Sequence, residues 1–200
     1  MKNCVNILFI FSIVLFSCSQ NGQNQKLNFN EGYIWYYRYY HTSKNIPGYE
    51  NEPPTIDTIM LKIIEKSNLG KDSAMIKFNQ NFIRFWDYSI LETDSGYRYY
   101  LGHYGAPFLI KYPIVKNHRW QQRFTSWVQE ECKISCVDTT VILNNQIYKN
   151  CFIIEVNRSY DGWIHHIQMY FNKKYGLLYY SEPEFEEKYT LLKMEKVKRE

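Results

Sequence analysis

Cysteine is the residue type in this 200-residue chain whose spacing most directly suggests covalent chemistry. Cys132 and Cys136 are four residues apart on an expected strand, so they share a face but stand about 13 Å apart, beyond disulfide reach. If Asn144-Asn145 forms a two-residue turn, Cys151 lies opposite Asp138, and Cys136 is one diagonal step away, at about 7–8 Å. A bulge near Asp138 would close that gap. The spacing leaves two alternatives, a Cys136–Cys151 disulfide or small apolar core residues.

The histidines and glutamates lack the spacing of a metal site. His165 and His166 are adjacent, and neighbours on a strand point to opposite faces, so the two cannot chelate one ion. The paired CxxC motifs of structural zinc sites are missing. Glu182, Glu184 and Glu186 share one face of an extended segment, where we expect a solvated acidic edge that discourages strand pairing rather than a cation site. We predict no metal and no cofactor.

The sequence also lacks the motifs of common enzymes. It contains no Gly-x-Ser-x-Gly elbow, no His-Glu-x-x-His helix and no phosphate-binding loop. With 24 basic and 20 acidic residues, charge is nearly balanced, and no basic stripe is available to neutralise phosphates. We therefore expect a non-catalytic protein that binds no nucleic acid.

The start of the chain points to a different kind of cysteine chemistry. Lys2 precedes an apolar run from Val5 to Phe16, which is too short for a membrane span and typical of a signal peptide. The run ends in Leu15-Phe16-Ser17-Cys18, which resembles the bacterial lipobox. The resemblance implies that residues 1–17 are a lipoprotein signal peptide and that Cys18 is the lipid attachment site. The alternative is an ordinary cleaved signal in which Cys18 plays no part.

Residues 18–30 are polar and rich in amides, which predicts a flexible tether. Twelve residues of such a chain would hold the folded part on the order of 20 Å from the bilayer. Ser19 follows the cysteine, and by resemblance to sorted lipoproteins this favours the outer membrane; no acidic cluster of a surface-export tag follows. We predict a lipid-anchored protein of the cell envelope that faces the periplasm, with the membrane as partner and one domain over residues 31–200.

Composition indicates β structure in that domain, because nineteen Tyr and twelve Phe residues suit a pleated surface while Ala is almost absent. Turn residues separate eleven β-rich runs. The runs are Tyr33–Thr42, Asp57–Ser67, Ser73–Asn79, Phe82–Leu91, Tyr97–Leu101, Phe108–Tyr112, Ser126–Leu143, Gln146–Asn157, Trp163–Asn172, Leu177–Ser181 and Lys188–Val197. We predict a mainly β fold, a single curved antiparallel sheet or half-barrel of about ten strands with minor helix, at Phe82–Ser89 and Asn117–Arg123.

Motifs between Lys111 and Val197 carry a family resemblance. Tyr112-Pro113 precedes Trp120, a strand contains Tyr148-Lys149-Asn150-Cys151-Phe152, and Tyr170–Tyr180 forms an aromatic hairpin. This series resembles uncharacterised exported β-rich bacterial lipoproteins, some of which are related in shape to the half-barrel of the lipoprotein carrier LolA. The resemblance implies an architecture with Trp120 in the core, and no activity.

Two functions remain open. The curved sheet could bind a hydrophobic ligand or partner lipoprotein; alternatively, exposed Tyr and Trp faces could make the protein a glycan-binding accessory lipoprotein. The candidate ligand-facing aromatics are Trp35, Tyr37 and Tyr39, which share one face of the first strand, and Trp163. Core packing is the competing explanation for these rings. Several exposed coplanar rings would favour the sugar, and a concave apolar cavity would favour the lipid.

Overall fold

The computed structural model describes residues 26–27, 29, 31–42, 51–71, 73–80, 89–99, 107–123 and 127–197. The predicted signal peptide, Cys18 and residues 18–25 of the predicted tether lie outside these ranges. Residues 82–88, where a short helix is one expectation, lie outside them as well.

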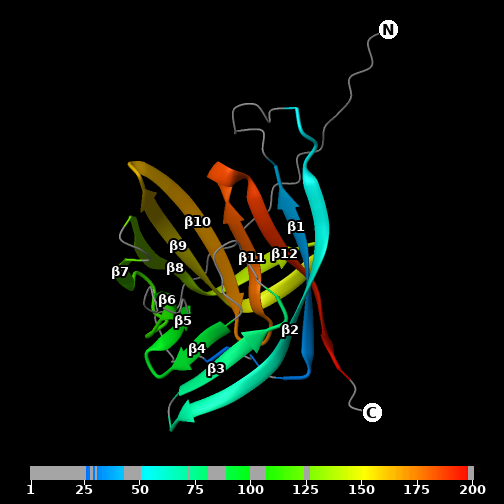
Figure 1. The fold of residues 1–200 in the computed structure, drawn as a ribbon, viewed down its shortest axis with the longest axis vertical. Helices are drawn as coiled ribbons and strands as arrows, with labels where there is room; N and C mark the ends of the chain where they lie inside the picture. The colour runs from blue at the N-terminus through cyan, green and yellow to red at the C-terminus, as the bar shows by residue number, and fades with distance from the viewer. Residues whose placement is uncertain are drawn as a thin grey trace.

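Twelve antiparallel strands form one sheet, which curls until its two edges approach each other (Figure 1). In chain order they are β1 (Tyr33–His41), β2 (Thr55–Gly70), β3 (Ser73–Phe78), β4 (Ser89–Thr93), β5 (Gly96–Tyr99), β6 (Phe108–Lys111), β7 (Arg119–Arg123), β8 (Val128–Leu143), β9 (Gln146–Tyr160), β10 (Trp163–Asn172), β11 (Gly176–Glu182) and β12 (Glu187–Lys196). The predicted mainly β fold is confirmed, as a nearly closed barrel, and helix within the described ranges is limited to the 3-10 turn η2 (Pro183–Phe185).

Each strand pairs with its neighbours in the sequence except at β6 and β7, which form the two edges of the sheet, and the first strand, β1, also pairs with the last, β12. Closely spaced turn residues favour such hairpins, because a two-residue turn can join only antiparallel strands. Asn144-Asn145 and Asp161-Gly162 form the turns after β8 and β9, all four residues with positive φ. Gly176, which opens β11, has φ +73°, the left-handed conformation that a residue with a Cβ would strain.

The helix expected at Asn117–Arg123 is wrong, because Arg119–Arg123 form strand β7. The segment pairs with β8 in antiparallel register, with Trp120 opposite Cys132. Trp120 is buried between exposed neighbours, which is a strand alternation of period two rather than a helical one. Its burial agrees with the core position that the family resemblance implies.

The edges of the sheet, β6 and β7, are joined by one side chain. The Phe108 N–H of β6 donates to Gln122 Oε1 at 2.7 Å, and Gln122 Nε2 donates back to the Phe108 carbonyl at 2.9 Å. The Gln122 carboxamide thus takes the place of a peptide group between β6 and β7, since it presents a carbonyl oxygen and an N–H to the Phe108 backbone. We call this contact the Gln122 latch.

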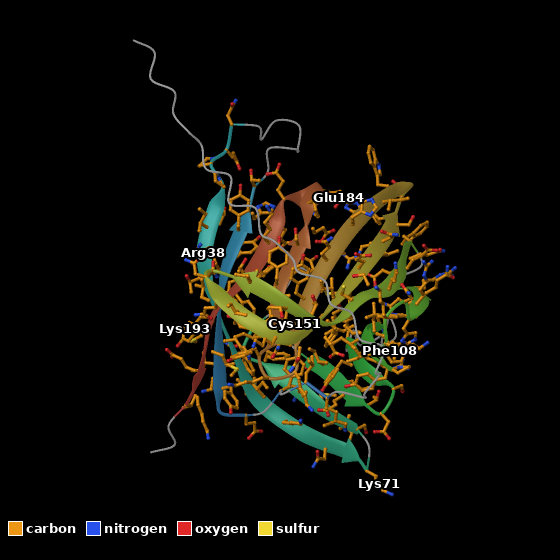
Figure 2. The ribbon with its side chains drawn as sticks, turned by 180° about the vertical axis from the view of Figure 1, so that it is seen from behind. Arg38, Lys71, Phe108, Cys151, Glu184 and Lys193 are labelled. Atoms are coloured by element: carbon orange, nitrogen blue, oxygen red, sulfur yellow. The ribbon has the colours of Figure 1, made fainter. Side chains whose placement is uncertain are left out.

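The barrel has two ends, which we name from Figure 1. The lower end carries the β2–β3 turn, and the upper end carries the β9–β10 turn and η2. The long β8–β9 hairpin bends between Asp138 and Asn150, both of which have positive φ, and its tip crosses the barrel towards β12 (Figure 2). There Asn144 Nδ2 donates to the Leu191 carbonyl at 3.2 Å.

Candidate functional site

The lower interior is packed with apolar and aromatic side chains that the chain's own start completes. Leu27 and Phe29 are buried, although residues 18–30 are predicted to be a flexible tether. The Phe29 ring makes edge contacts with Trp35 at 6.4 Å and with Tyr97 at 5.4 Å, measured between ring centroids. The Leu27 N–H donates to the Tyr97 hydroxyl at 2.8 Å. The tether prediction is therefore wrong at its end, because two apolar residues there fill the core.

Salt bridges fasten the same segment at the edge of the lower end. Lys26 Nζ lies 3.4 Å from one carboxylate oxygen of Glu92, and Lys66 Nζ lies 3.0 Å from the other. Lys66 also donates to the Phe29 carbonyl at 3.4 Å. Lys26, Leu27 and Phe29 therefore belong to the folded domain.

The upper interior differs in holding charged side chains. Arg158 of β9 and Glu130 of β8 face each other in the register, and Arg158 Nε donates to Glu130 Oε1 at 2.8 Å. One Arg158 terminal nitrogen lies 3.7 Å from Glu182 Oε1 of β11. Both carboxylates are buried, so the guanidinium offsets charge that would otherwise be costly to remove from water.

The expectation of a solvated acidic edge at Glu182, Glu184 and Glu186 is wrong for Glu182. Its side chain is fully buried and accepts a hydrogen bond from the Tyr180 hydroxyl at 2.6 Å. His165 Nδ1 lies 3.6 Å from the same carboxylate. Alternation along β11 turns Tyr180 and Glu182 inward, whereas Glu184 follows in η2 and accepts from the backbone N–H of His166 at 3.0 Å.

His165 and His166 point to opposite faces, as predicted. His165 is half-buried beside Glu182, while the exposed His166 ring contacts Asn157 Oδ1 at 2.8 Å. In the ranges that the structure covers, no group of His, Cys, Asp or Glu is arranged to hold a metal ion.

The charged group, which we call the upper ion cluster, consists of Glu130, Arg158, His165 and Glu182. It connects to the Gln122 latch, because Gln122 Nε2 also donates to Glu130 Oε2 at 2.6 Å. Burial and the Glu130 charge both raise the pKa of the nearby Cys132 thiol, and burial raises the pKa of Tyr180. These shifts reflect a dry interior in which new negative charge is unfavourable.

One small cavity lies inside the barrel among the residues that the structure describes. The enclosed cavity between β5, β6 and β11, which Arg158 and Met169 also line, measures about 10 Å³, roughly the space of one water molecule. The concave apolar cavity that would favour a lipid ligand is thus not present among the described side chains.

Cys132, Cys136 and Cys151 are free cysteines in the part of the chain that the structure describes, so it does not contain the Cys136–Cys151 disulfide that was one of the two alternatives. Bulges in β8 shift the register, which sets Cys151 opposite Thr139 and Cys136 opposite Ile153. These three of the chain's five cysteines are buried, as the other alternative, small apolar core residues, requires. Cys151, at the centre of Figure 2, donates its thiol proton to the Tyr148 carbonyl at 3.3 Å.

Two of the four candidate ligand-facing aromatics are core residues. Trp35 and Tyr37 are 1% and 2% exposed, and their polar atoms donate to the carbonyls of Tyr175 and Leu177, at 3.0 and 2.9 Å. Both rings are therefore core residues rather than part of an exposed binding face, and Phe29 of the N-terminal segment packs against Trp35.

The other two candidates lie towards the upper end. Tyr39 is half-buried, with its ring 4.8 Å from that of Tyr189. Trp163 is 73% exposed at the β9–β10 tip, opposite Tyr160 in the register. The structure therefore does not bring the four rings together on one binding face.

A groove of about 570 Å³ lies on the outside of the barrel over β7, β8 and β9. Its outward side chains alternate with the buried residues Trp120, Cys132 and Val156. These outward residues are Arg119 and Gln121 of β7, Glu131 and Lys133 of β8, and Glu155 and Asn157 of β9. The groove is as large as many ligand sites, and its walls are polar.

The register arranges these side chains in two rows. Gln121, Glu131 and Asn157 form one row, and Gln121 Nε2 donates to Glu131 Oε1 at 2.8 Å. Arg119, Lys133 and Glu155 form the other. The groove therefore offers amides and charges of both signs within a few ångströms of each other.

Trp127 precedes Glu131 of the groove by four residues, about 13 Å along an extended chain. It is 78% exposed and precedes β8, where strand alternation continues the outward series of Gln129 and Glu131. No sequence motif indicates the groove, because its residues belong to three separate strands. The segment of one of these strands, β7, is expected to be helical from the sequence. The alternation of Arg119 and Gln121 about Trp120 is the signal that could have indicated it.

Comparisons with known proteins add one distant structural similarity. No protein-family model and no curated protein matches the chain. A solved structure from Bacteroides fragilis, described as a "putative exported protein with YmcC-like fold", aligns with 87% of this chain and 100% of its own, with a TM-score of 0.46 and 9% identity. At that level the similarity carries no conclusion about this chain. No helix in the described ranges has the length and apolar character needed to cross a membrane.

Proposed function

We propose that the protein is a non-catalytic lipoprotein of the cell envelope that binds a glycan in the outer groove of β7, β8 and β9. The observation that carries the proposal is the groove itself, a polar site of about 570 Å³ on a barrel whose interior is filled.

The chemistry of the groove suits a sugar. Gln121 and Asn157 each offer an amide donor and acceptor, and Glu131 and Arg119 add a charged acceptor and a charged donor. Planar amide, carboxylate and guanidinium groups can form hydrogen bonds with the hydroxyl and acetamido groups of a sugar. Trp127 provides an exposed indole on the same outer series, against which the apolar face of a sugar ring can pack.

The hydrophobic-ligand alternative finds less support. An acyl chain needs an apolar cavity of a few hundred ångströms cubed, whereas the enclosed space near Met169 is about 10 Å³. Location in the envelope is supported by the sequence alone, through the lipobox-like segment that ends at Cys18. An outer-membrane anchor with the barrel in the periplasm remains part of the proposal.

Titration with soluble oligosaccharides tests the sugar site. The chain from Cys18 onward, with Cys18→Ser, is titrated with β-1,4-linked N-acetylglucosamine tetramer and with maltotetraose, and tryptophan fluorescence is followed. We expect saturable binding of at least one of them. Trp127→Ala and the double variant Gln121→Ala/Asn157→Ala should each weaken binding about tenfold or more.

Trp163→Ala is the matched control, because it removes an equally exposed indole whose strand position faces the barrel mouth instead. Binding by this variant should remain at the level of the unmodified chain. The groove would be contradicted as a glycan site if neither sugar bound saturably. It would also be contradicted if Trp127→Ala and Trp163→Ala lowered the affinity equally.

A further inference from the structure

A second surface, on the outside of β12, β1 and β2, combines positive charge with exposed apolar groups. Strand pairing places Lys193, Tyr36 and Met60 in one outward row and Lys188, Tyr40 and Ile56 in another. The row between them contains Thr190, Arg38 and Thr58, and the row below contains Glu195, Ile34 and Lys62. We call these four rows the Tyr–Lys face.

Four cations and a single anion occupy the Tyr–Lys face. Arg38, Lys62, Lys188 and Lys193 are all exposed, and Arg38 and Lys193 project from the same flank in Figure 2. The anion, Glu195, accepts a hydrogen bond from Lys193 at 2.6 Å. The four rows therefore contain more positive than negative side chains.

Aromatic and aliphatic side chains lie between these cations. Lys193 Nζ is 4.5 Å from the Tyr36 ring centroid, and Lys188 Nζ is 5.7 Å from that of Tyr40. On β2, Ile56 and Met60 are exposed by 65% and 43%. Exposed apolar side chains clustered on an otherwise polar surface indicate an interaction site.

We propose that the Tyr–Lys face binds the surface of an anionic lipid bilayer. Lysine and arginine head groups can reach lipid phosphates while their stems lie along the apolar layer, and tyrosine favours the membrane–water interface. Ile56 and Met60 then insert at the boundary of the acyl chains. A soluble acidic polymer would match the cations but would leave these aliphatic groups in water, so the combination favours lipid.

This inference rests on the anchored location proposed above. Seven residues separate Cys18 from Lys26, and a chain of that length reaches about 25 Å. An anchor within that distance raises the effective concentration of the face at the bilayer, so that a contact of low intrinsic affinity suffices. The barrel would then lie on its side against the membrane, with β12, β1 and β2 in contact with lipid.

Vesicle co-sedimentation tests the proposal without the anchor. The chain from Cys18 onward, with Cys18→Ser, is mixed with vesicles of phosphatidylcholine and 30% phosphatidylglycerol, or of phosphatidylcholine alone. We expect binding to the anionic vesicles only, and weaker binding at high salt. Arg38→Gln/Lys62→Gln should lower the partition coefficient about thirtyfold.

Two further variants separate the explanations. Arg119→Gln/Lys133→Gln removes the same charge from the outer groove and should leave lipid binding nearly unchanged. Ile56→Ser/Met60→Ser should reduce lipid binding while retaining all the cations, and circular dichroism on heating checks that each variant is folded.

Equal losses in the two charge variants would overturn the proposal, since the effect would then be one of net charge. Lipid binding that is insensitive to Ile56→Ser/Met60→Ser, or binding to soluble polygalacturonate as tight as to the vesicles, would overturn it in favour of a soluble polyanion. The sugar titration contains no lipid and the sedimentation contains no sugar, so failure of either proposal is distinct from failure of the other.

Discussion

The two halves of the barrel interior are stabilised by different interactions, apolar packing in the lower half and buried ion pairs in the upper half. In the lower interior, Phe29 and Trp35 meet as rings, and Leu27 completes the core. In the upper interior, Arg158 is held between Glu130 and Glu182. The apolar half gains from removal of surface from water, while the charged half depends on every partner being present.

This difference teaches where a ligand can and cannot bind. A barrel with an empty polar interior would be a candidate for a ligand cavity, but here the upper ion cluster lies in the interior, and the cavity that Arg158 lines measures about 10 Å³. Both proposed binding surfaces, the groove of β7, β8 and β9 and the Tyr–Lys face, lie on the outside of the barrel.

The largest effect should come from removal of the cation in the upper interior. Arg158→Leu leaves Glu130 and Glu182 buried without their guanidinium, and we expect a loss of roughly 4–5 kcal/mol in the free energy of unfolding, measured in urea. Arg119→Leu, on the exposed groove, should change it by less than about 0.5 kcal/mol. A small effect of Arg158→Leu would mean that the cluster is hydrated rather than dry.

Phe29→Ala tests the apolar half, with an expected loss of about 3–4 kcal/mol on unfolding in urea. Leu69→Ala, on the exposed end of β2, is the control and should have little effect. Stability unchanged by Phe29→Ala would restore the tether prediction for residues 18–30 and separate this segment from the core.

Alkaline pH should weaken the lower interior. Burial raises the pKa of Tyr37 and of Tyr97 far above the ordinary value of 10 and that of Tyr112 to about 12. Below pH 10 these tyrosines are protonated in both the folded and the unfolded protein, so the free energy of unfolding does not depend on their ionisation. Above pH 10 the tyrosines of the unfolded chain lose their protons, while the buried ones in the folded protein keep theirs. Stability should therefore fall above pH 10, by up to about 1.4 kcal/mol per pH unit for each fully buried tyrosine.

Urea unfolding from pH 8 to 11.5, with tyrosinate absorbance followed in parallel, measures this effect. Tyr37→Phe, which also loses a hydrogen bond to the Leu177 carbonyl, should show a shallower decline with pH than the unmodified chain. A decline that begins well below pH 10 would contradict this assignment to tyrosine ionisation.

The smallest effect should come from the Gln122 latch, which connects the upper ion cluster to the seam. Gln122→Leu removes the bonds to Phe108 and to Glu130, but solvent can replace those at the seam, so we expect a loss of about 1–2 kcal/mol. Hydrogen exchange should accelerate at the Phe108 amide. Unchanged exchange there would show that the seam is held by other contacts.

Local signals in the sequence predict much of the fold. Asn144-Asn145 and Asp161-Gly162 specify their hairpins because each turn depends only on its own residues and their positive φ. Gly176 likewise marks the start of β11. Strand β10 is predicted with its observed bounds, Trp163–Asn172, since polar turn residues flank an aromatic run on both sides.

The errors arise where a distant residue decides the outcome. Glu182 is predicted to be solvated because its partner, Arg158, lies 24 positions earlier in the sequence, and nothing local reveals the pair. Arg119–Arg123 gains its strand from pairing with β8. The register of Cys151 depends on bulges that a count of alternating residues cannot locate. The candidate groove was missed for the same reason, as three strands contribute to it.

The central claim, that the interior is closed and the outer groove binds, is tested most directly by heteronuclear NMR during titration with the N-acetylglucosamine tetramer. The account predicts shifts confined to the Trp127 indole and the outward residues of β7, β8 and β9, with the methyl groups of Ile134 and Ile154 inside the barrel unaffected. Shifts of those interior methyl groups, with the groove residues unchanged, would contradict it.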